Sequence, residues 1–182
     1  NGIDDDCDGL TDEGVATIHN VTANTYHCSI QSAINAATAG DVINVPAGTY
    51  AEDITVSTSV SILGPNANID PCSGTRVAEA IVVPATGDIA VREIFHVAAS
   101  NVTISGFTID GDNTSITSGF TSTNGADIDA AEGVTVYETG VNNLTVSNNI
   151  LQNLSYFGVT LYDYPAGVPS SGHSITNNKF QN

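Results

Sequence analysis

The stretch LTVSNNILQN, residues 144–153, returns 29 residues later as HSITNNKFQN, residues 173–182. In both copies apolar and small polar residues alternate before a pair of asparagines, at positions 148–149 and 177–178. Such alternation predicts short strands, and a repeat of roughly 20 to 50 residues indicates a solenoid. We expect the paired asparagines to stack at corners of successive turns and to hydrogen-bond along the coil axis.

The same alternation continues through the chain. It predicts strands in DVINV, DITVSTSVSIL, AIVV, NVTISGFTI, GVTVY, NLTVSNNI and GVTLY, all within residues 41–162. A second apparent repeat has a shift of 21 residues and relates Val60 and Ile62 to Ile81 and Val83, and these to Val102 and Ile104. Asn, Gly, Asp and Ser fill the connections, where they tolerate the left-handed backbone of tight corners.

One short helix is expected ahead of the strands, over residues 29–39. Apolar residues share one helical face there, Ser29 can cap the start and Gly40 can end the helix. The residues of that face are Ile30, Ala33, Ile34 and Ala37. No other part of the sequence predicts a helix.

This pattern resembles the right-handed parallel β-helix of the pectin-lyase-like superfamily, over about residues 27–182. The resemblance rests on SIQSAINAATAGDVINVPAGTY, SVSILGPNANI, NVTISGFTIDG and the two asparagine-bearing repeats. It implies an all-β domain over residues 15–182, with the short helix capping the N-terminal end of the coil. Because the sequence stops inside a repeat, we expect the coil to continue in a longer parent protein.

The first 14 residues differ from the rest because they contain six acids and no base. Oxygen-bearing side chains at alternate positions, followed by Gly9, are typical of a calcium loop. The expected ligands are Asp4, Asp6, Asp8, the backbone carbonyl of Leu10, and Asp12 or Glu13. The stretch DDDCDGLTDEG resembles the Asp-rich metal-binding motif of secreted bacterial proteins and thrombospondin type 3 repeats, which implies calcium as the cofactor. A solvated acidic linker is the alternative.

The three cysteines do not have zinc-site spacing, which favours a disulfide. We predict a Cys28–Cys72 bond, because these residues flank the first part of the main domain. A Cys7–Cys28 bond is the alternative, and the sequence does not choose between them.

The charge balance limits the possible partners. The chain has 20 acids and 3 bases among its 182 residues, and a formal net charge of −17. Nucleic acid and anionic membranes would be repelled, whereas cations, glycans and cell-surface proteins remain possible partners. No apolar run is long enough for membrane insertion. A Thr-, Ser-, Asn- and Gly-rich composition favours an extracellular or cell-surface location.

The superfamily includes lyases, hydrolases and esterases as well as adhesins, so catalytic residues must be sought directly. A lyase base has few candidates, and Arg76 is expected to pair with Glu79. The carboxylates that a hydrolase needs could come from Asp110, Asp112, Asp127 and Asp129, but NTD, GHG and RIK motifs are absent. The four histidines have no evident partner. These acids, with Tyr162 and Tyr164, are instead candidate glycan contacts.

We therefore interpret the chain as a secreted or cell-surface calcium-binding β-helix module with a structural or adhesive role. It would present one face to glycans or proteins. A fragment of a carbohydrate-active enzyme is the alternative, and a self-assembling subunit of an extracellular filament is a second.

Overall fold

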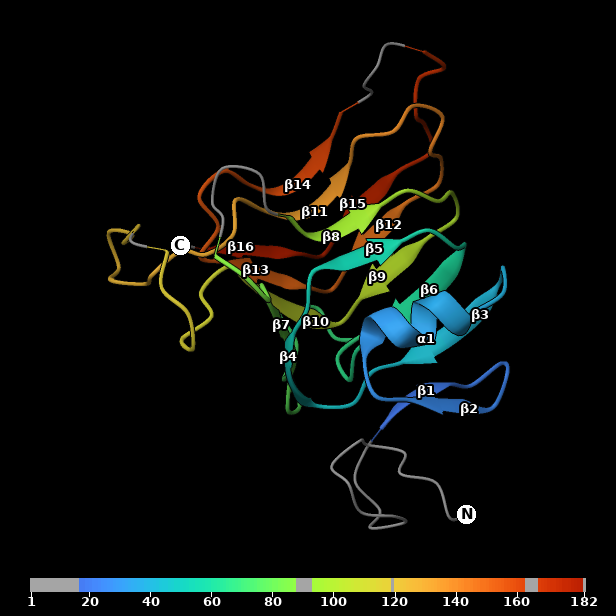
Figure 1. The fold of residues 1–182 in the computed structure, drawn as a ribbon, viewed down its shortest axis with the longest axis horizontal. Helices are drawn as coiled ribbons and strands as arrows, with labels where there is room; N and C mark the ends of the chain where they lie inside the picture. The colour runs from blue at the N-terminus through green and yellow to red at the C-terminus, as the bar shows by residue number, and fades with distance from the viewer. Residues whose placement is uncertain (1–16, 88–92, 119, 163–166, 182) are drawn as a thin grey trace.

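The computed structural model describes residues 17–87, 93–118, 120–162 and 167–181, and shows a coil of short parallel strands (Figure 1). Each turn of the coil contributes one strand to each of three sheets, here named A, B and C. Sheet A contains β1 (Ile18–Asn20), β2 (Thr25–His27), β3 (Asp41–Asn44), β6 (Val60–Leu63), β9 (Thr103–Ser105), β12 (Thr145–Ser147) and β15 (Ser174–Thr176). Sheet B contains β4 (Gly48–Ala51), β7 (Ala80–Val83), β10 (Phe107–Asp110), β13 (Ile150–Gln152) and β16 (Lys179–Gln181). Sheet C contains β5 (Ile54–Val56), β8 (Glu93–Val97), β11 (Glu132–Val136) and β14 (Phe157–Leu161). The predicted parallel β-helix is confirmed.

The strand register decides between the two apparent repeats. Thr145 pairs with Ser174, and Ile150 pairs with Lys179, so the 29-residue shift is one full turn of the coil. The 21-residue shift is wrong, because Ile62 pairs directly with Ile104 in sheet A. Ile81 instead lies in sheet B, on a different side of the coil. The turn from β6 to β9 is longer than the turn from β12 to β15, because a long loop joins β6 to β7.

Apolar side chains from all three sheets fill the inside of the coil. Ile62, Ile104 and Val146 occupy equivalent positions in successive turns and are fully buried. The rings of Phe95 in sheet C and Phe107 in sheet B lie 6.1 Å apart between centroids. Each such buried side chain stabilises the folded state by roughly 1.5–3 kcal/mol, so the stacked apolar rows are the main source of stability.

The predicted asparagine stack is confirmed at the corner between sheets A and B. Asn148 and Asn177 have positive φ angles of 57° and 52°, which turn the chain sharply. The residues that follow them, Asn149 and Asn178, lie along the same corner and hydrogen-bond with neighbouring turns. Asn149 Nδ2 donates to Asn178 Oδ1 at 3.1 Å, and Asn149 Oδ1 accepts from the Phe107 N–H at 2.9 Å. One side chain therefore links three turns.

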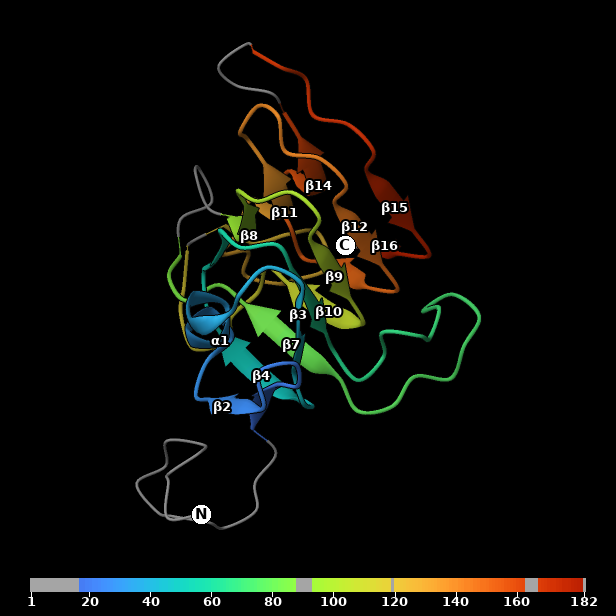
Figure 2. The ribbon, with the colours of Figure 1, turned by 90° about the vertical axis from the view of Figure 1, so that its right-hand side faces the viewer.

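The N-terminal end of the coil is covered by helix α1 (Ile30–Ala36) and the β1–β2 hairpin, as seen in Figures 1 and 2. Ser29 is the N-cap and forms a capping box with Ser32, as the cap prediction requires. The helix ends at Ala36, before Gly40, which instead has φ 95° in the turn leading to β3. The sequence did not predict the hairpin, whose β1 pairs antiparallel with β3.

Most predicted strands are present, but three of the predicted runs each reach into two strands of different sheets: residues 53–63, 101–109 and 143–150. The run of residues 53–63 forms two strands, β5 in sheet C and β6 in sheet A, because the chain turns a corner inside it. The strands β4 and β8 were not predicted from the sequence. β8 contains Glu93 and His96 as well as buried apolar residues, and these polar residues disguise the alternation.

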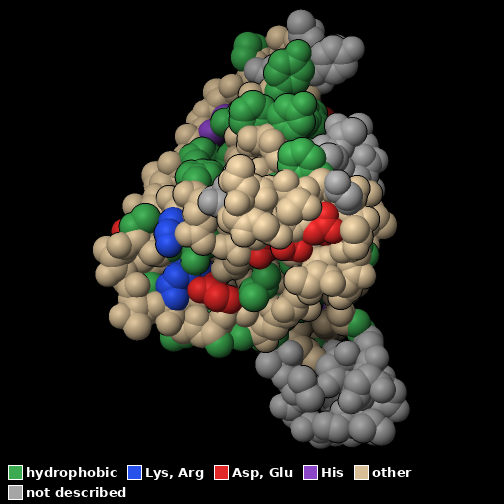
Figure 3. Space-filling model, turned by 90° about the vertical axis from the view of Figure 1, so that its left-hand side faces the viewer, with side chains coloured by type: hydrophobic (Ala, Val, Ile, Leu, Met, Phe, Trp, Pro, Cys, Tyr) green, Lys and Arg blue, Asp and Glu red, His purple; other side chains and the backbone are tan. Residues whose placement is uncertain are grey.

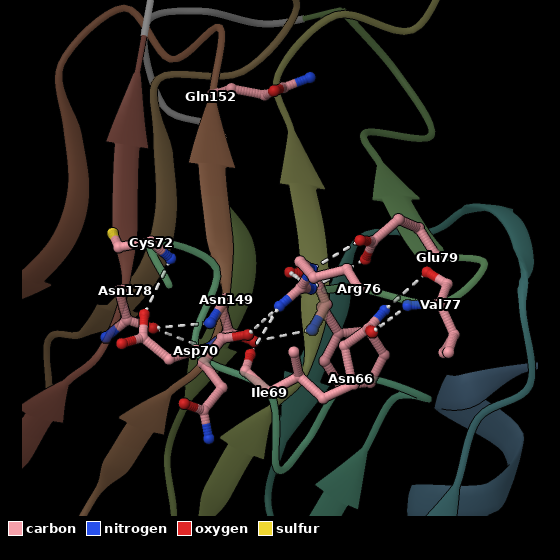
Figure 4. Close-up of polar contacts among 12 residues, drawn as sticks. Asn66, Ile69, Asp70, Cys72, Arg76, Val77, Glu79, Asn149, Gln152 and Asn178 are labelled. Carbon is pink, nitrogen blue, oxygen red and sulfur yellow. Dashed lines mark hydrogen bonds and ion pairs between the residues drawn. The ribbon is translucent and has the colours of Figure 1, made fainter. Parts of the chain in front are cut away.

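The loop between β6 and β7 is fastened along the asparagine corner by Arg76, which is shown in Figure 4. Its guanidinium donates to both carboxylate oxygens of Glu79, at 2.6 and 2.8 Å, so the predicted pairing is confirmed. It also donates to the backbone carbonyls of Ile69, Asn148 and Phe107. Only 10% of the Arg76 side chain is exposed. This loop is thus held against the next two turns of the coil.

The predicted Cys28–Cys72 disulfide is wrong. Cys72 is a free, exposed cysteine in the β6–β7 loop, which projects from the coil on the side away from α1 (Figure 2). Cys28 lies just before α1 and is disulfide-bonded. The two residues therefore occupy different sides of the coil. The alternative partner, Cys7, lies outside the described residues.

Candidate functional site

The four predicted aspartates gather where sheet B passes to sheet C. Asp110 ends β10, and the other three belong to the loop of residues 111–131 that follows it. The Asp112 N–H donates to Asp110 Oδ1 at 3.1 Å, and burial together with the charges of Asp110, Asp129 and Asp127 raises the pKa of Asp112. The four carboxylates therefore lie close together, largely within one loop, and their role as glycan contacts stays a prediction.

Asp110 is the centre of a hydrogen-bonded array of amide side chains. Its Oδ2 accepts from Gln152 Nε2 at 2.6 Å, and its Oδ1 accepts from Asn153 Nδ2 at 2.8 Å. The array extends further, because Gln181 Nε2 donates to Gln152 Oε1 at 2.7 Å. Asn124 Nδ2, from the 111–131 loop, donates to Asn153 Oδ1 at 3.3 Å. Asp110 is thus held as a fixed hydrogen-bond acceptor by amides from the next turn.

A hollow of about 300 Å³ lies beside this array, and all four of its lining residues carry amide side chains. They are Asn124, Gln152, Asn153 and Gln181. The hollow lies at the end of β13 and β16 in sheet B. Figure 3 shows one face of the molecule, on which acidic side chains lie near basic ones, hydrophobic side chains gather in the upper part, and the rest is mostly backbone and uncharged side chains. We name this hollow the amide hollow.

The acids behind the amide hollow differ in their electrostatic surroundings. Burial raises the pKa of Asp112, and the charges of Asp110, Asp129 and Asp127 raise it further. Asp129 is fully buried, and this burial raises the pKa of its carboxyl although the N–H of Asn113 donates to it at 3.0 Å. The cluster therefore holds a proton more readily than separate aspartates would, and it disfavours anionic ligands nearby.

The other predicted site residues do not join this cluster. Tyr162 directly follows β14, an edge strand of sheet C, and is 57% exposed. Tyr164 and the predicted calcium ligands Asp4, Asp6, Asp8, Leu10, Asp12 and Glu13 lie outside the described residues. Within residues 17–87, 93–118, 120–162 and 167–181, no three His, Cys, Asp or Glu side chains are arranged to hold a metal ion.

A second polar cluster, which the sequence did not reveal, lies on sheet C. His96 is hydrogen-bonded on both ring nitrogens, to Glu93 Oε1 at 2.9 Å and to Glu138 Oε1 at 2.7 Å. The prediction that the histidines have no partner is therefore wrong for His96. Glu132, which is paired in register with Glu93, accepts from the Tyr137 hydroxyl and, at 2.7 Å, from Thr160. We name this group the sheet C cluster.

The sheet C cluster is electrostatically coupled. Burial lowers the pKa of His96, but the hydrogen bonds and charges of Glu138 and Glu93 outweigh this effect, so the pKa is raised overall. Burial also raises the pKa of Tyr137, and the hydrogen bond and charge of Glu132 add to the effect. Tyr137 therefore stays protonated and acts as a hydrogen-bond donor, and the cluster offers carboxylates held in fixed positions.

The amide array around Asp110 and the sheet C cluster both depend on strand register, so their contacts join residues that are far apart in the sequence. Gln152 and Gln181 are related by the 29-residue repeat that the sequence displays, so their stacking could have been predicted from it. Glu138 comes to His96 from 42 residues away, across a turn whose loops have irregular lengths. No local pattern signals that contact.

Comparison with known protein families matches residues 19–182 to the family described as a protein of unknown function, DUF1565. The match covers most of the chain, and the protein therefore belongs to this family. Neither the curated proteins nor the solved structures provide a significant match. No helix among the described residues is long and apolar enough to cross a membrane.

Proposed function

We propose that this protein is a secreted or cell-surface β-helix module that binds neutral glycans in the amide hollow beside sheet B. The observation that carries the proposal is the lining of the hollow. It consists of four amide side chains, two of which, Gln152 and Asn153, are oriented by Asp110.

The chemistry of amides suits sugar hydroxyls. A glutamine or asparagine side chain offers two N–H donors and an acceptor oxygen, and a hydroxyl both donates and accepts. The contacts to Asp110 fix Gln152 and Asn153 before a ligand arrives, which lowers the entropy that binding costs. The neighbouring acids would repel a uronate polymer, so a neutral glycan fits the site better.

Calorimetric titration tests this proposal with neutral and uronate oligosaccharides of matched length. We expect heat of binding with neutral oligosaccharides only. Replacing Gln152 by leucine should weaken this binding by about tenfold, because the hollow loses an oriented donor and acceptor. Thr176→Val, an exposed substitution in sheet A, is the matched control and should leave the affinity unchanged. Equal binding of wild type and the Gln152→Leu variant would contradict the assignment of the site.

Residues 1–14 are proposed to bind calcium, on the basis of the spacing of their acids and Gly9. Calcium titration of the wild-type chain and of an Asp6→Asn, Asp8→Asn double variant would test it. We expect saturable binding that the double variant loses. Calcium affinity that survives in the variant would rule out this loop as the site.

A carbohydrate-active enzyme is the second candidate function, and the sheet C cluster is the observation that favours it. Glu132 is buried, with 8% of its surface exposed, and accepts hydrogen bonds from Tyr137 and Thr160. Glu93 lies at the equivalent position of the neighbouring strand. Two carboxylates in different surroundings can serve as acid and base. Release of reducing ends from neutral polysaccharides, abolished by Glu132→Gln, would establish the activity.

A further inference from the structure

We infer that Asn124, which lines the amide hollow, is a site of spontaneous deamidation, in which its side-chain amide is converted to a carboxylate. The reaction uses the backbone nitrogen of the glycine that follows, Gly125, and water. It changes the lining of the hollow and so weakens glycan binding, and this consequence rests on the proposed function. The inference comes from the exposure of the two residues, from the hydrogen bonds to the Asn124 side-chain oxygen and from the contact of Asn124 with Asn153.

Asn124 and Gly125 lie at the tip of a small hairpin within the loop of residues 111–131. The Ser122 N–H donates to the Ala126 carbonyl at 2.8 Å and closes this hairpin. Both tip residues are exposed, so water reaches the peptide bond between them. A Cβ at Gly125 would meet no atom within 4 Å, so the surrounding structure leaves the tip room to rearrange.

Two donors hold the side-chain oxygen of Asn124. Its Oδ1 accepts from the Ala126 N–H at 3.1 Å and from the Ser122 hydroxyl. Negative charge develops on this oxygen when a nucleophile adds to the amide carbon, and donors that are already in place stabilise that charge. The nucleophile is the Gly125 nitrogen. Its N–H donates to the Ser122 carbonyl at 3.0 Å and must leave this bond before the attack, which the open space at the tip permits.

The reaction balances with water as the only added reagent. The Gly125 nitrogen attacks Cγ of Asn124 and closes a succinimide ring. The bond between Cγ and Nδ2 breaks, and Nδ2 leaves as ammonia with the proton that the Gly125 nitrogen carried. Water then adds to either ring carbonyl and breaks its bond to the ring nitrogen. The product is aspartate or isoaspartate at position 124.

The neighbouring pair Asp110–Gly111 could close the same ring with loss of water, but its surroundings prevent this. A Cβ at Gly111 would lie 1.9 Å from the Asn153 carbonyl oxygen, so the backbone is tightly enclosed there. The Gly111 N–H donates to the Gln152 carbonyl at 3.0 Å. The Asp110 carboxylate is held by the side chains of Gln152 and Asn153. We therefore expect ring closure at Asn124 and none at Asp110.

Deamidation disturbs the hydrogen bonds of Asn153. Asn124 Nδ2 donates to Asn153 Oδ1 at 3.3 Å, and Asn153 Nδ2 in turn donates to Asp110 Oδ1 at 2.8 Å. An aspartate at position 124 has only acceptor oxygens, so it cannot donate to Asn153 Oδ1. Turning the Asn153 amide over would offer its nitrogen to the new carboxylate but take it from Asp110. The modified hollow therefore loses a donor, gains a negative charge and no longer fixes Asn153 from both sides.

Peptide mass mapping of the folded chain, kept in a mildly alkaline buffer, tests the modification. We expect aspartate and isoaspartate to accumulate at position 124 ahead of every other asparagine in the described part of the chain. Asn124→Gln keeps an amide but cannot close the five-membered ring, so position 124 should stay unmodified in this variant. A free peptide of residues 120–128 is the unfolded reference. Modification of the peptide but not of the folded chain would overturn the inference, because the hairpin would then protect Asn124.

Calorimetry with a neutral oligosaccharide tests the consequence for the amide hollow. Asn124→Asp reproduces one product in a stable form and should bind about tenfold more weakly than the fresh wild type. Aged wild type should lose affinity as the modified fraction grows, whereas aged Asn124→Gln should keep its own starting affinity. Equal affinity of fresh and modified wild type overturns the effect on the hollow. Absence of binding to the fresh protein overturns the proposed function, and the mass mapping still decides whether Asn124 deamidates.

Discussion

The backbone N–H and the side-chain Nδ2 of Asn149 both donate to Oδ1 of Asn178, 29 residues later in the chain, at 3.0 and 3.1 Å. Asn149 also donates to the Ile104 carbonyl and accepts from the Phe107 N–H in the preceding turn. Its side chain is completely buried. Successive turns of the coil are thus joined by side chains as well as by the strands.

Replacing Asn149 by alanine is expected to lower the free energy of unfolding by about 2–4 kcal/mol. The substitution leaves the Phe107 N–H and the Ile104 carbonyl buried without their partner, and each such group costs roughly 1–3 kcal/mol. Chemical denaturation measures the change. Asn44→Ala, at an exposed position of β3, is the control and should change stability by less than about 0.5 kcal/mol. Equal effects of the two substitutions would show that the stack is not stabilising.

The His96 contacts predict a stability that depends on pH. The pKa of His96 is raised in the folded protein above its ordinary value of 6.5. Its protonated form therefore stabilises the fold at pH below that ordinary value, and the contribution is lost as the pH rises through the raised pKa. The groups facing the ring are Glu93 on β8 and, after β11, Tyr137 and Glu138.

Denaturation of wild type and the His96→Gln variant at about pH 5.5 and about pH 8.5 tests this dependence. We expect the wild type to exceed the variant in stability by more at the lower pH, because the imidazolium then binds both glutamates. His27→Gln, a substitution in β2 away from the sheet C cluster, is the control. A difference that grows with pH would mean that the neutral ring is the stabilising form.

Arg76→Lys should loosen the β6–β7 loop. Lysine cannot donate to both oxygens of Glu79 and to three backbone carbonyls at once, so we expect a loss of about 2 kcal/mol. Hydrogen exchange should accelerate in residues 66–79 and stay slow in the strands. Ser73→Ala, which removes one exposed hydrogen bond to Asp70 in the same loop, should have a much smaller effect. Unchanged exchange in the Arg76→Lys variant would contradict the role given to the guanidinium.

The cysteines should differ in reactivity. Cys72 is free and exposed, so a thiol reagent should label it in the folded protein without a reductant. Cys28 is disulfide-bonded and should be labelled only after reduction. Peptide mass mapping locates the label. Labelling of Cys28 in the unreduced protein, or protection of Cys72, would contradict these assignments.

Much of the fold follows from local sequence patterns. The alternation of apolar and small polar residues marks most strands, and the 29-residue repeat gives the last complete turn. Ser29 and the apolar face after it predict α1. The preceding turns were harder to predict, because the loops inside them have different lengths. As a result the true spacing of 42 residues between Ile62 and Ile104 was read as two shifts of 21.

The candidate sites were predictable to different degrees. Asp112, Asp127 and Asp129 lie in one loop, so their proximity to Asp110 follows from short sequence distances. The amide partners of Asp110 depend on the pairing of β10 with β13, which no local pattern specifies. The sheet C cluster likewise requires β8 and β11 to be in register. The disulfide prediction failed because distance along the sequence does not show which side of the coil a residue occupies.

The location of a bound glycan tests the central claim most directly. A crystal structure of the chain with a neutral hexasaccharide would show it. We predict a ligand that lies in the amide hollow and contacts Gln152 and Asn153. A ligand bound at Glu93 and Glu132 on sheet C, with none in the amide hollow, would contradict the account.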